Sequence, residues 1–301
     1  MKIRTFGSEW NRGTVRQFCC NTQIEKVADY NQFTGMKTFF TQDTYHTPPD
    51  LPQHWLDVLS LGTRAFFTLS FIRIVLVSAQ ISRKGLYDRE MWVSSSLDVL
   101  HLIESCKGKF HITGIDNIRN LQEPVVYVSN HMSTLETMIF PGIIASMHEA
   151  TFVVKDSLVK HRFFGPVMRA RNPIVVSRSN SREDLITVLS QGQEMLKNGI
   201  SVIIFPQSTR STTFKPSEFN TLGVKLASKA GAKVVPIAIK TDFWENGRWV
   251  KDLGPIYRKR PIHIAIGQPI TVEGSGKETH SAVVSFIEGH LKEWEAAVLE
   301  A

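Results

Sequence analysis

Val125-Val-Tyr-Val-Ser-Asn-His-Met-Ser-Thr-Leu-Glu-Thr-Met138 is the stretch of this 301-residue chain that decides its expected fold. Its first five residues, Val125 to Ser129, are mostly apolar and β-branched, which predicts a short buried strand. A polar loop follows, and from Thr134 onward the sequence predicts a helix with an apolar surface. Ligands of α/β proteins bind at such a place, because the carboxyl end of a strand meets the positive end of a helix there.

Two residues in this stretch, His131 and Glu136, are candidates for chemistry. On one continuous helix they would be rotated by about 140° from each other and would not share a face. They can meet only if His131 lies in the turn and Glu136 in the first helical turn, which suits a general base and the carboxylate that orients it. The alternative is a capping box, in which Glu136 closes the helix start on the backbone of Ser133. This stretch alone leaves both interpretations open.

Outward from this stretch, predicted strands alternate with predicted helices from about residue 90 onward. The alternation indicates an α/β fold with a largely parallel central sheet flanked by helices. Strands are predicted at 110–114, 125–129, 151–154, 174–177, 201–205, 233–239 and 263–266, and helices at 91–106, 182–197, 222–229 and 277–297. Three of the strands lead, in chain order, into residues that can bind an anion or move a proton: His131, Lys155 and Arg210.

The chain is predicted to have three parts: a polar arm at 1–50, an apolar and basic helical region at 51–90, and a main domain at 91–301. The helical region is long and apolar, but Arg64 and Arg73 interrupt it. These charges favour a helix that lies at the membrane surface over one that spans the bilayer. The basic residues that follow suit an anionic leaflet. The alternative is a helix that simply packs on the main domain.

Charge and cysteine content restrict the partners and the compartment. The chain has 35 Lys and Arg against 28 Asp and Glu, a formal net charge of +7, and 42% hydrophobic residues. Such a folded, basic chain is expected to bind phosphates, acidic lipids, nucleic acid or an acidic carrier protein. Nucleic acid is not the expected partner, because no nucleic-acid-binding motif accompanies the charge. Three cysteines without paired spacing argue for a reducing compartment and against a disulfide framework or a zinc site.

A second block, Phe205-Pro-Gln-Ser-Thr-Arg-Ser211, places a proline, small hydroxyl residues and one arginine after a predicted buried strand. Backbone amides and a guanidinium in such a loop can hold a phosphate through charge-assisted hydrogen bonds. Together with Asn130-His-x4-Glu136, Lys155 and Ile174-Val-Val-Ser-Arg178, this ordered set resembles the glycerolipid acyltransferase family. The best-known members of that family are the 1-acyl-sn-glycerol-3-phosphate acyltransferases. The resemblance covers roughly residues 108–270.

The resemblance implies a reaction and residue roles. His131 would be the general base that takes the proton of the acceptor hydroxyl, and Glu136 would be its partner. Binding of the acceptor's phosphate would fall to Arg210, Lys155, Thr209, Ser208 and Gln207. The hydroxyl would attack the acyl thioester of coenzyme A or acyl carrier protein directly, so no metal or cofactor is expected. The acceptor would be a lysophospholipid, 1-acylglycerol-3-phosphate, at the cytoplasmic face of a membrane with anionic lipids, where the protein is peripheral or shallowly inserted.

Two departures from the family pattern affect the expected substrate. The acid of the first block is Glu136 instead of the usual Asp, and Gln207-Ser208 replaces the usual Glu-Gly of the second block. Glu136 keeps the charge, whereas Gln207 loses one and Ser208 loses the freedom of glycine at positive φ. These changes leave open another lysolipid acceptor, such as lyso-ornithine lipid. They also leave open a non-catalytic lipid-binding protein on the same fold.

Overall fold

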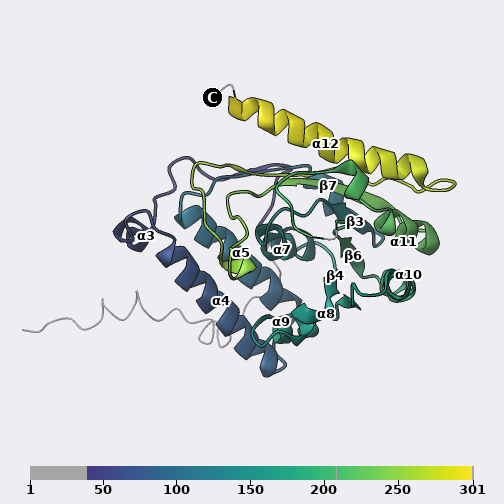
Figure 1. The fold of residues 1–301 in the computed structure, drawn as a ribbon, viewed down its shortest axis with the longest axis horizontal. Coiled ribbons are helices and arrows are strands. Elements are labelled where there is room, and N and C mark those ends of the chain that lie inside the picture. Colours follow the sequence, from purple (N-terminus) through teal and green to yellow (C-terminus); the bar gives the residue numbers. More distant parts are fainter. Residues whose placement is uncertain (1–38, 208, 300–301) are drawn as a thin grey trace, which may run out of the picture. The chain divides into compact units, whose positions relative to one another are not determined.

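The computed structural model of the chain describes residues 39–207 and 209–299, which belong to one compact unit, Thr38–Ala301. The predictions made for residues 1–38 and for Ser208 therefore lie outside the described residues. Figure 1 shows the described part as a central sheet with helices packed around it.

The central sheet has eight strands in the order β1-β2-β8-β7-β3-β6-β4-β5 (Figure 1). They are β1 (Tyr45–His46), β2 (Phe110–Thr113), β3 (Val126–Ser129), β4 (Ala150–Lys155), β5 (Ile174–Val176), β6 (Ser201–Ile204), β7 (Val234–Lys240) and β8 (Ile262–Ile266). Among these strands, the β1–β2 and β7–β8 pairs are antiparallel. The remaining neighbours are parallel. The predicted α/β fold with a largely parallel sheet is confirmed, and each predicted strand from residue 110 onward is present.

The helices pack on both faces of the sheet. They are α3 (Trp55–Leu59), α4 (Ala65–Arg83), α5 (Arg89–Ser105), α6 (Asp116–Arg119), α7 (Leu135–Phe140), α8 (Asp156–Lys160), α9 (Phe164–Ala170), α10 (Ser181–Lys197), α11 (Leu222–Ala230) and α12 (Lys277–Leu299), with a π-helical turn η2 (Pro141–Ala145) and 3-10 turns η3 (Pro216–Glu218) and η4 (Lys251–Leu253). On one face Gly223 of α11 lies so close to Val128 of β3 that a Cβ would clash. On the other face Trp92 of α5 packs edge-to-face on Phe152 of β4.

Local sequence signals explain where several helices begin and end. The side chain of Asp88 accepts the backbone N–H of Met91 at the start of α5. Asn180 does the same for the first amides of α10. Helix α11 ends at Gly231, whose φ of +67° is a left-handed conformation that glycine adopts without steric cost. Strands β3 and β6 are buried along their whole length, because they lie in the middle of a sheet covered on both faces.

The last part of the predicted polar arm packs on the sheet. Strand β1 pairs with β2, and Phe40 is buried. The hydroxyls of Tyr45 and Thr47 both donate to Glu104 of α5, each at 2.7 Å. The described residues of this segment are therefore part of the compact unit.

The apolar region 51–90 forms α3 and α4, and α4 packs against α5 and α9. Phe67 and Phe71 of α4 are buried and pack edge-to-face on Trp244. The opposite side of α4 exposes Leu69, and α3 and its following turn expose further large apolar side chains. Helix α4 has the length and apolar composition of a membrane-crossing helix, but a core helix of a soluble protein passes the same test. Membrane association remains a prediction.

Candidate active site

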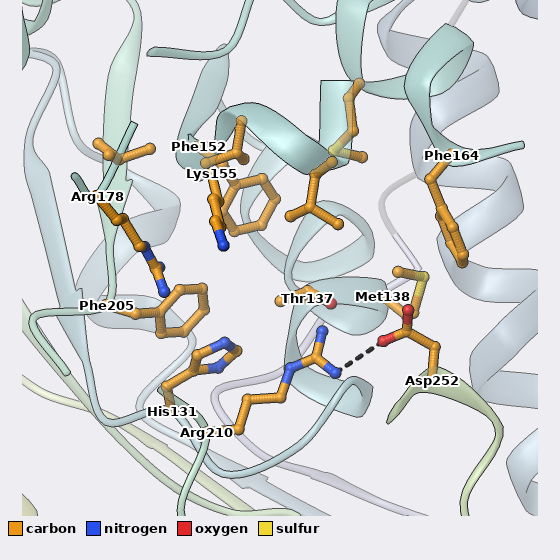
Figure 2. Close-up of a pocket in the computed structure, with 14 residues that line it drawn as sticks. His131, Thr137, Met138, Phe152, Lys155, Phe164, Arg178, Phe205, Arg210 and Asp252 are labelled. Carbon is orange, nitrogen blue, oxygen red and sulfur yellow. Dashed lines mark hydrogen bonds and ion pairs between the residues drawn. The ribbon is translucent and has the colours of Figure 1, made fainter. Parts of the chain in front are cut away.

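Four neighbouring parallel strands direct their carboxyl ends to one place. The loops after β3, β6 and β5 carry His131, Arg210 and Arg178, respectively, and Lys155 is the last residue of β4. All four residues line one cavity of about 80 Å³. Figure 2 shows the imidazole of His131 at its base and the nitrogen atoms of Lys155, Arg178 and Arg210 directed into it. The structure thus brings together three residues that the sequence assigned to the site. It places beside them Arg178, which the sequence named in the ordered set of blocks without assigning it to the phosphate.

His131 and Glu136 meet as the loop-and-helix arrangement requires. His131 lies in the turn after β3, and Glu136 lies in the first turn of α7. The Nδ1 atom of His131 is 2.8 Å from Oε1 of Glu136, whose side chain is fully buried. A hydrogen bond from Nδ1 to a carboxylate leaves Nε2 as the nitrogen that can accept a proton. This geometry holds the imidazole in one tautomer against a buried carboxylate.

The carboxylate of Glu136 also closes the start of its helix. Its Oε1 accepts the backbone N–H groups of Met132 and Ser133 at 2.7 and 2.8 Å. Its Oε2 accepts the hydroxyls of Ser133 and Thr241 at 2.9 and 2.7 Å. Burial alone would raise the pKa of Glu136, but the hydrogen bond and charge of His131 and the hydrogen bonds from Ser133 and Thr241 outweigh it and hold the pKa below its usual range. The two alternatives left open by the sequence coexist in one side chain.

The loop that carries His131 is held from both sides. The side-chain amide of Asn130 donates to the backbone oxygen of Ile239 and accepts its N–H, both at 2.9 Å. These two bonds tie the loop to the end of β7. On the other side, the backbone oxygen of His131 accepts the N–H of Ser211 at 2.9 Å. Because buried hydrogen bonds of this kind are costly to break, they fix the position of the loop that carries His131.

Two of the predicted phosphate-binding residues do not line the cavity. Gln207 is buried, and its Oε1 accepts the backbone N–H of His131 at 2.6 Å, so this side chain supports the His131 loop. Thr209 is exposed, and its hydroxyl contacts the backbone oxygen of Arg210. Gln207, which replaces the usual Glu of the family pattern, therefore uses its neutral amide oxygen to accept a hydrogen bond from the His131 loop.

Phe205 covers one face of the imidazole. Its ring stacks on that of His131 with 4.3 Å between centroids and an interplanar angle of 20°. Phe205 also stacks on Phe140 of α7 and Phe152 of β4, which extends an aromatic wall along the cavity. An apolar wall on one side of the base excludes water from it and leaves the ring edge to the cavity. Sequence reasoning placed Phe205 in a strand and assigned it no role.

The cationic groups of the cavity differ in their local partners. Arg210 forms an ion pair with Asp252, with 2.7 Å between Nη1 and Oδ1. Arg178 has a left-handed backbone with φ of +59°, and Asp184 accepts its N–H at 2.7 Å. Burial lowers the pKa of the Arg178 guanidinium from its usual range; Asp184 opposes this effect, and the nearby charge of Arg210 adds to it. Lys155 ends β4 and is exposed. Three cations and one carboxylate, that of Asp252, therefore line the cavity, and its formal charge is positive.

The rest of the cavity is apolar and continues away from His131. A second cavity of about 40 Å³ lies among α4, α5, α7 and α9. Four residues line both cavities: Thr137, Met138, Phe164 and Met168. The second cavity is lined further by apolar residues of α4, among them Ile74 and Val75. The site thus combines a histidine–glutamate pair, cations and apolar residues that line two adjoining cavities.

Residues 109–240 match the sequence model of a family described as Acyltransferase. A 1-acyl-sn-glycerol-3-phosphate acyltransferase of Pseudomonas aeruginosa is 32% identical over 169 residues, which cover 56% of this chain and 62% of the relative. The chloroplastic 1-acyl-sn-glycerol-3-phosphate acyltransferase LPAT1 of Arabidopsis thaliana is 29% identical over 150 residues, 50% of this chain and 39% of the relative. The chain therefore spans less than two thirds of the length of these relatives.

Among solved structures, the 1-acyl-sn-glycerophosphate (LPA) acyltransferase PlsC of Thermotoga maritima has a similar fold. The TM-score is 0.56 at 24% identity, and the match covers 76% of this chain and 95% of the other. At this identity the likeness concerns the fold. Together the matches confirm the resemblance to glycerolipid acyltransferases that the ordered sequence blocks indicated.

Proposed function

Because residues 109–240 match the acyltransferase family, we propose that this protein transfers a fatty acyl group from a thioester to the free hydroxyl of a lysophospholipid. The proposed acceptor is 1-acylglycerol-3-phosphate, and the product is phosphatidic acid. One observation carries the proposal: the His131–Glu136 pair lies at the base of a cavity that is both cationic and apolar.

In the proposed reaction, Nε2 of His131 takes the proton of the acceptor hydroxyl while the hydroxyl oxygen attacks the thioester carbonyl carbon. Glu136 stabilises the imidazolium that forms, because its carboxylate is 2.8 Å from Nδ1. The carbon–sulfur bond then breaks, and the imidazolium returns the proton to the thiolate that leaves. Atoms and charges balance without a metal, a redox cofactor or an acyl-enzyme. The donor is acyl-coenzyme A or an acyl-carrier-protein thioester.

The cations support binding of the acceptor's phosphate. Three cations from different elements direct nitrogen atoms into the same cavity as His131 (Figure 2): Lys155 at the end of β4, Arg178 after β5 and Arg210 after β6. A phosphate monoester carries about −1.5 to −2 charges at neutral pH, and guanidinium groups bind it through charge-assisted hydrogen bonds. In this proposal Gln207 and Thr209 act on the loops and do not contact the phosphate directly.

The apolar lining supports binding of the acyl chain. It begins beside His131 with Phe205 and Phe152 and continues past Thr137 and Met138 into the cavity next to α4. Burial of methylene groups stabilises such a complex by about 0.8 kcal/mol each. An acyl chain in this lining would place its thioester carbonyl near the imidazole.

The exposed apolar side chains of α3 and α4 support a membrane-surface location. Four large apolar residues of this region are more than 60% exposed: Trp55 (63%), Leu59 (65%), Leu61 in the turn after α3 (89%) and Leu69 (68%). Such a patch is expected to enter the interfacial zone of a bilayer, with nearby arginines at anionic headgroups. We propose a peripheral or shallowly inserted position on the cytoplasmic face, which would let the lysolipid reach the cavity from the membrane.

The test is transfer of labelled acyl groups by purified protein, from acyl-coenzyme A and from acyl carrier protein, to a small panel of lysolipids. The His131→Ala variant is expected to lose transfer while its unfolding temperature stays near that of the wild type. His290→Ala, on α12 and outside the cavity lining, is the matched control. Transfer to another lysolipid would support the proposed mechanism and change the proposed acceptor. Equal transfer by the His131→Ala variant refutes the proposal, and no transfer from either donor favours a non-catalytic lipid-binding protein.

A further inference from the structure

Arg210 already holds an anion that belongs to this chain. Its Nη1 donates to Oδ1 of Asp252 at 2.7 Å (dashed line in Figure 2) and to the hydroxyl of Thr134 at 2.8 Å. The Thr134 hydroxyl in turn donates to the same Asp252 oxygen at 2.9 Å. A carboxylate oxygen between a guanidinium and a hydroxyl has the environment that a phosphate oxygen would find there.

Asp252 reaches this position from a loop that is anchored at its base and open at its tip. We define the strap as residues 244–256, which include the turn η4. Its base is closed by the bridge between Trp244 and Ile256, and Trp244 is buried against α4. Its tip carries Trp249, which is 90% exposed, three residues before Asp252. The anchored base keeps the strap beside the cavity. The backbone next to Asp252 is also held, because Lys251 accepts the N–H of Gly247 at 3.0 Å and Leu253 accepts a hydrogen bond from Arg64 at 2.8 Å. Displacement of Asp252 therefore requires a turn of its side chain and no movement of the strap.

Among the described residues, the side chain of Asp252 bonds to Arg210 and Thr134. The side chain of Asp252 is 22% exposed, and that of Arg210 is 17% exposed. Both side chains keep some access to water and line the cavity, so an anion in the cavity can reach the guanidinium and compete with the carboxylate for it. A phosphate monoester has more charge and more acceptor oxygens than a carboxylate, so it can make that displacement favourable.

We propose that Asp252 is an internal competitor that occupies the anion site of Arg210 and that the acceptor's phosphate must displace it before transfer. This inference rests on the proposed function. In the absence of an acceptor, Asp252 neutralises one of the cations that Lys155, Arg178 and Arg210 bring to the cavity. With an acceptor bound, the phosphate takes over that role and the carboxylate turns to solvent. Asp252 therefore raises the KM for the acceptor and does not take part in the chemical step.

The first measurement compares the wild type with Asp252→Asn. The initial rate of transfer is measured at saturating acyl donor as a function of the concentration of the acceptor, 1-acylglycerol-3-phosphate (lysophosphatidic acid). The variant keeps the size of the side chain and removes its charge. The KM for the acceptor is expected to fall about fivefold, equivalent to about 1 kcal/mol, while kcat changes less than about twofold. Glu218→Gln is the matched control, because Glu218 forms an exposed ion pair with Lys215 at 2.9 Å outside the cavity lining. Asp252→Ala replaces Asp252→Asn as the test variant if the asparagine variant does not fold.

The second measurement uses inorganic phosphate and does not depend on activity. Phosphate is expected to raise the unfolding temperature of Asp252→Asn at lower concentration than it does for the wild type. A higher KM or a lower kcat in the folded variant would show that Asp252 positions Arg210, and it would overturn the inference. Unchanged KM and unchanged phosphate dependence overturn it as well. If the wild type shows no His131-dependent transfer, the proposed function fails, and the phosphate titration still decides whether Asp252 competes at this site.

Discussion

Glu136→Gln separates the two roles of this carboxylate more cleanly than any other substitution. The amide has the same shape, and its oxygen can take the place of Oε1, which accepts N–H groups from His131, Met132 and Ser133. Its NH2 group then faces the hydroxyls of Ser133 and Thr241, which can rotate to accept instead of donating. The helix start and the tautomer of His131 are preserved, and only the negative charge is lost.

The expected loss of activity follows from the distance between the imidazolium of His131 and the carboxylate of Glu136. An imidazolium and a carboxylate whose charges lie about 4 Å apart attract each other by about 4 kcal/mol at an effective dielectric constant of about 20. The amide oxygen retains part of this attraction through its dipole, so we expect a net loss of about 2–3 kcal/mol in the transition state, where the imidazolium forms. This loss corresponds to a decrease in kcat of about 30- to 150-fold.

The assay is acyl transfer to lysophosphatidic acid at saturating substrates, with urea unfolding measured on the same preparations. Thr241→Val is the graded control, because it removes one hydrogen bond from Oε2 and leaves the charge of Glu136 in place. We expect it to lower kcat by at most about tenfold. If Glu136→Gln stays within about threefold of the wild type while folded, the carboxylate only caps the helix, and its assignment as the partner of the base is wrong.

Three further predictions concern stability and chain selection. Because folding lowers the pKa of Glu136, its ionised form stabilises the protein at pH values above its ordinary pKa. The stability advantage of the wild type over Glu136→Gln in urea should therefore shrink as the pH falls through the lowered folded-state pKa. Asn130→Ala leaves the buried N–H and C=O of Ile239 without their side-chain partner and should cost about 2–4 kcal/mol in urea unfolding, whereas a loss below about 0.5 kcal/mol would contradict the anchoring role. Val75→Trp should fill the cavity beside α4 and shift transfer toward shorter acyl thioesters, and an unchanged chain-length profile would argue that the acyl chain binds elsewhere.

The fold and the central pair were predictable from local sequence. Strands such as β3 and β6 are short, β-branched apolar runs, and α10 and α11 carry their own end signals in Asn180 and Gly231. The contact between His131 and Glu136 was predictable as one of two alternatives, because the two residues are close in the chain.

Other features of the site depend on contacts between residues far apart in sequence. Thr241 completes the bonding of Glu136 from a distance of 105 residues, and Asp252 reaches Arg210 from the strap. No local periodicity or motif marks either residue. Gln207 was expected at the phosphate, and the structure instead turns its oxygen to the backbone of the His131 loop.

The sequence by itself determined the order of strands and helices and placed His131, Lys155 and Arg210 at or after strand ends, because burial patterns and helix ends are local properties. The tertiary structure alone decided that these loops meet with Arg178 in one cavity, since strand order in a sheet depends on packing of distant segments. It also decided which charges face each other. A side chain such as Asp252 acquires its partner only when the strap folds across the carboxyl ends of the strands.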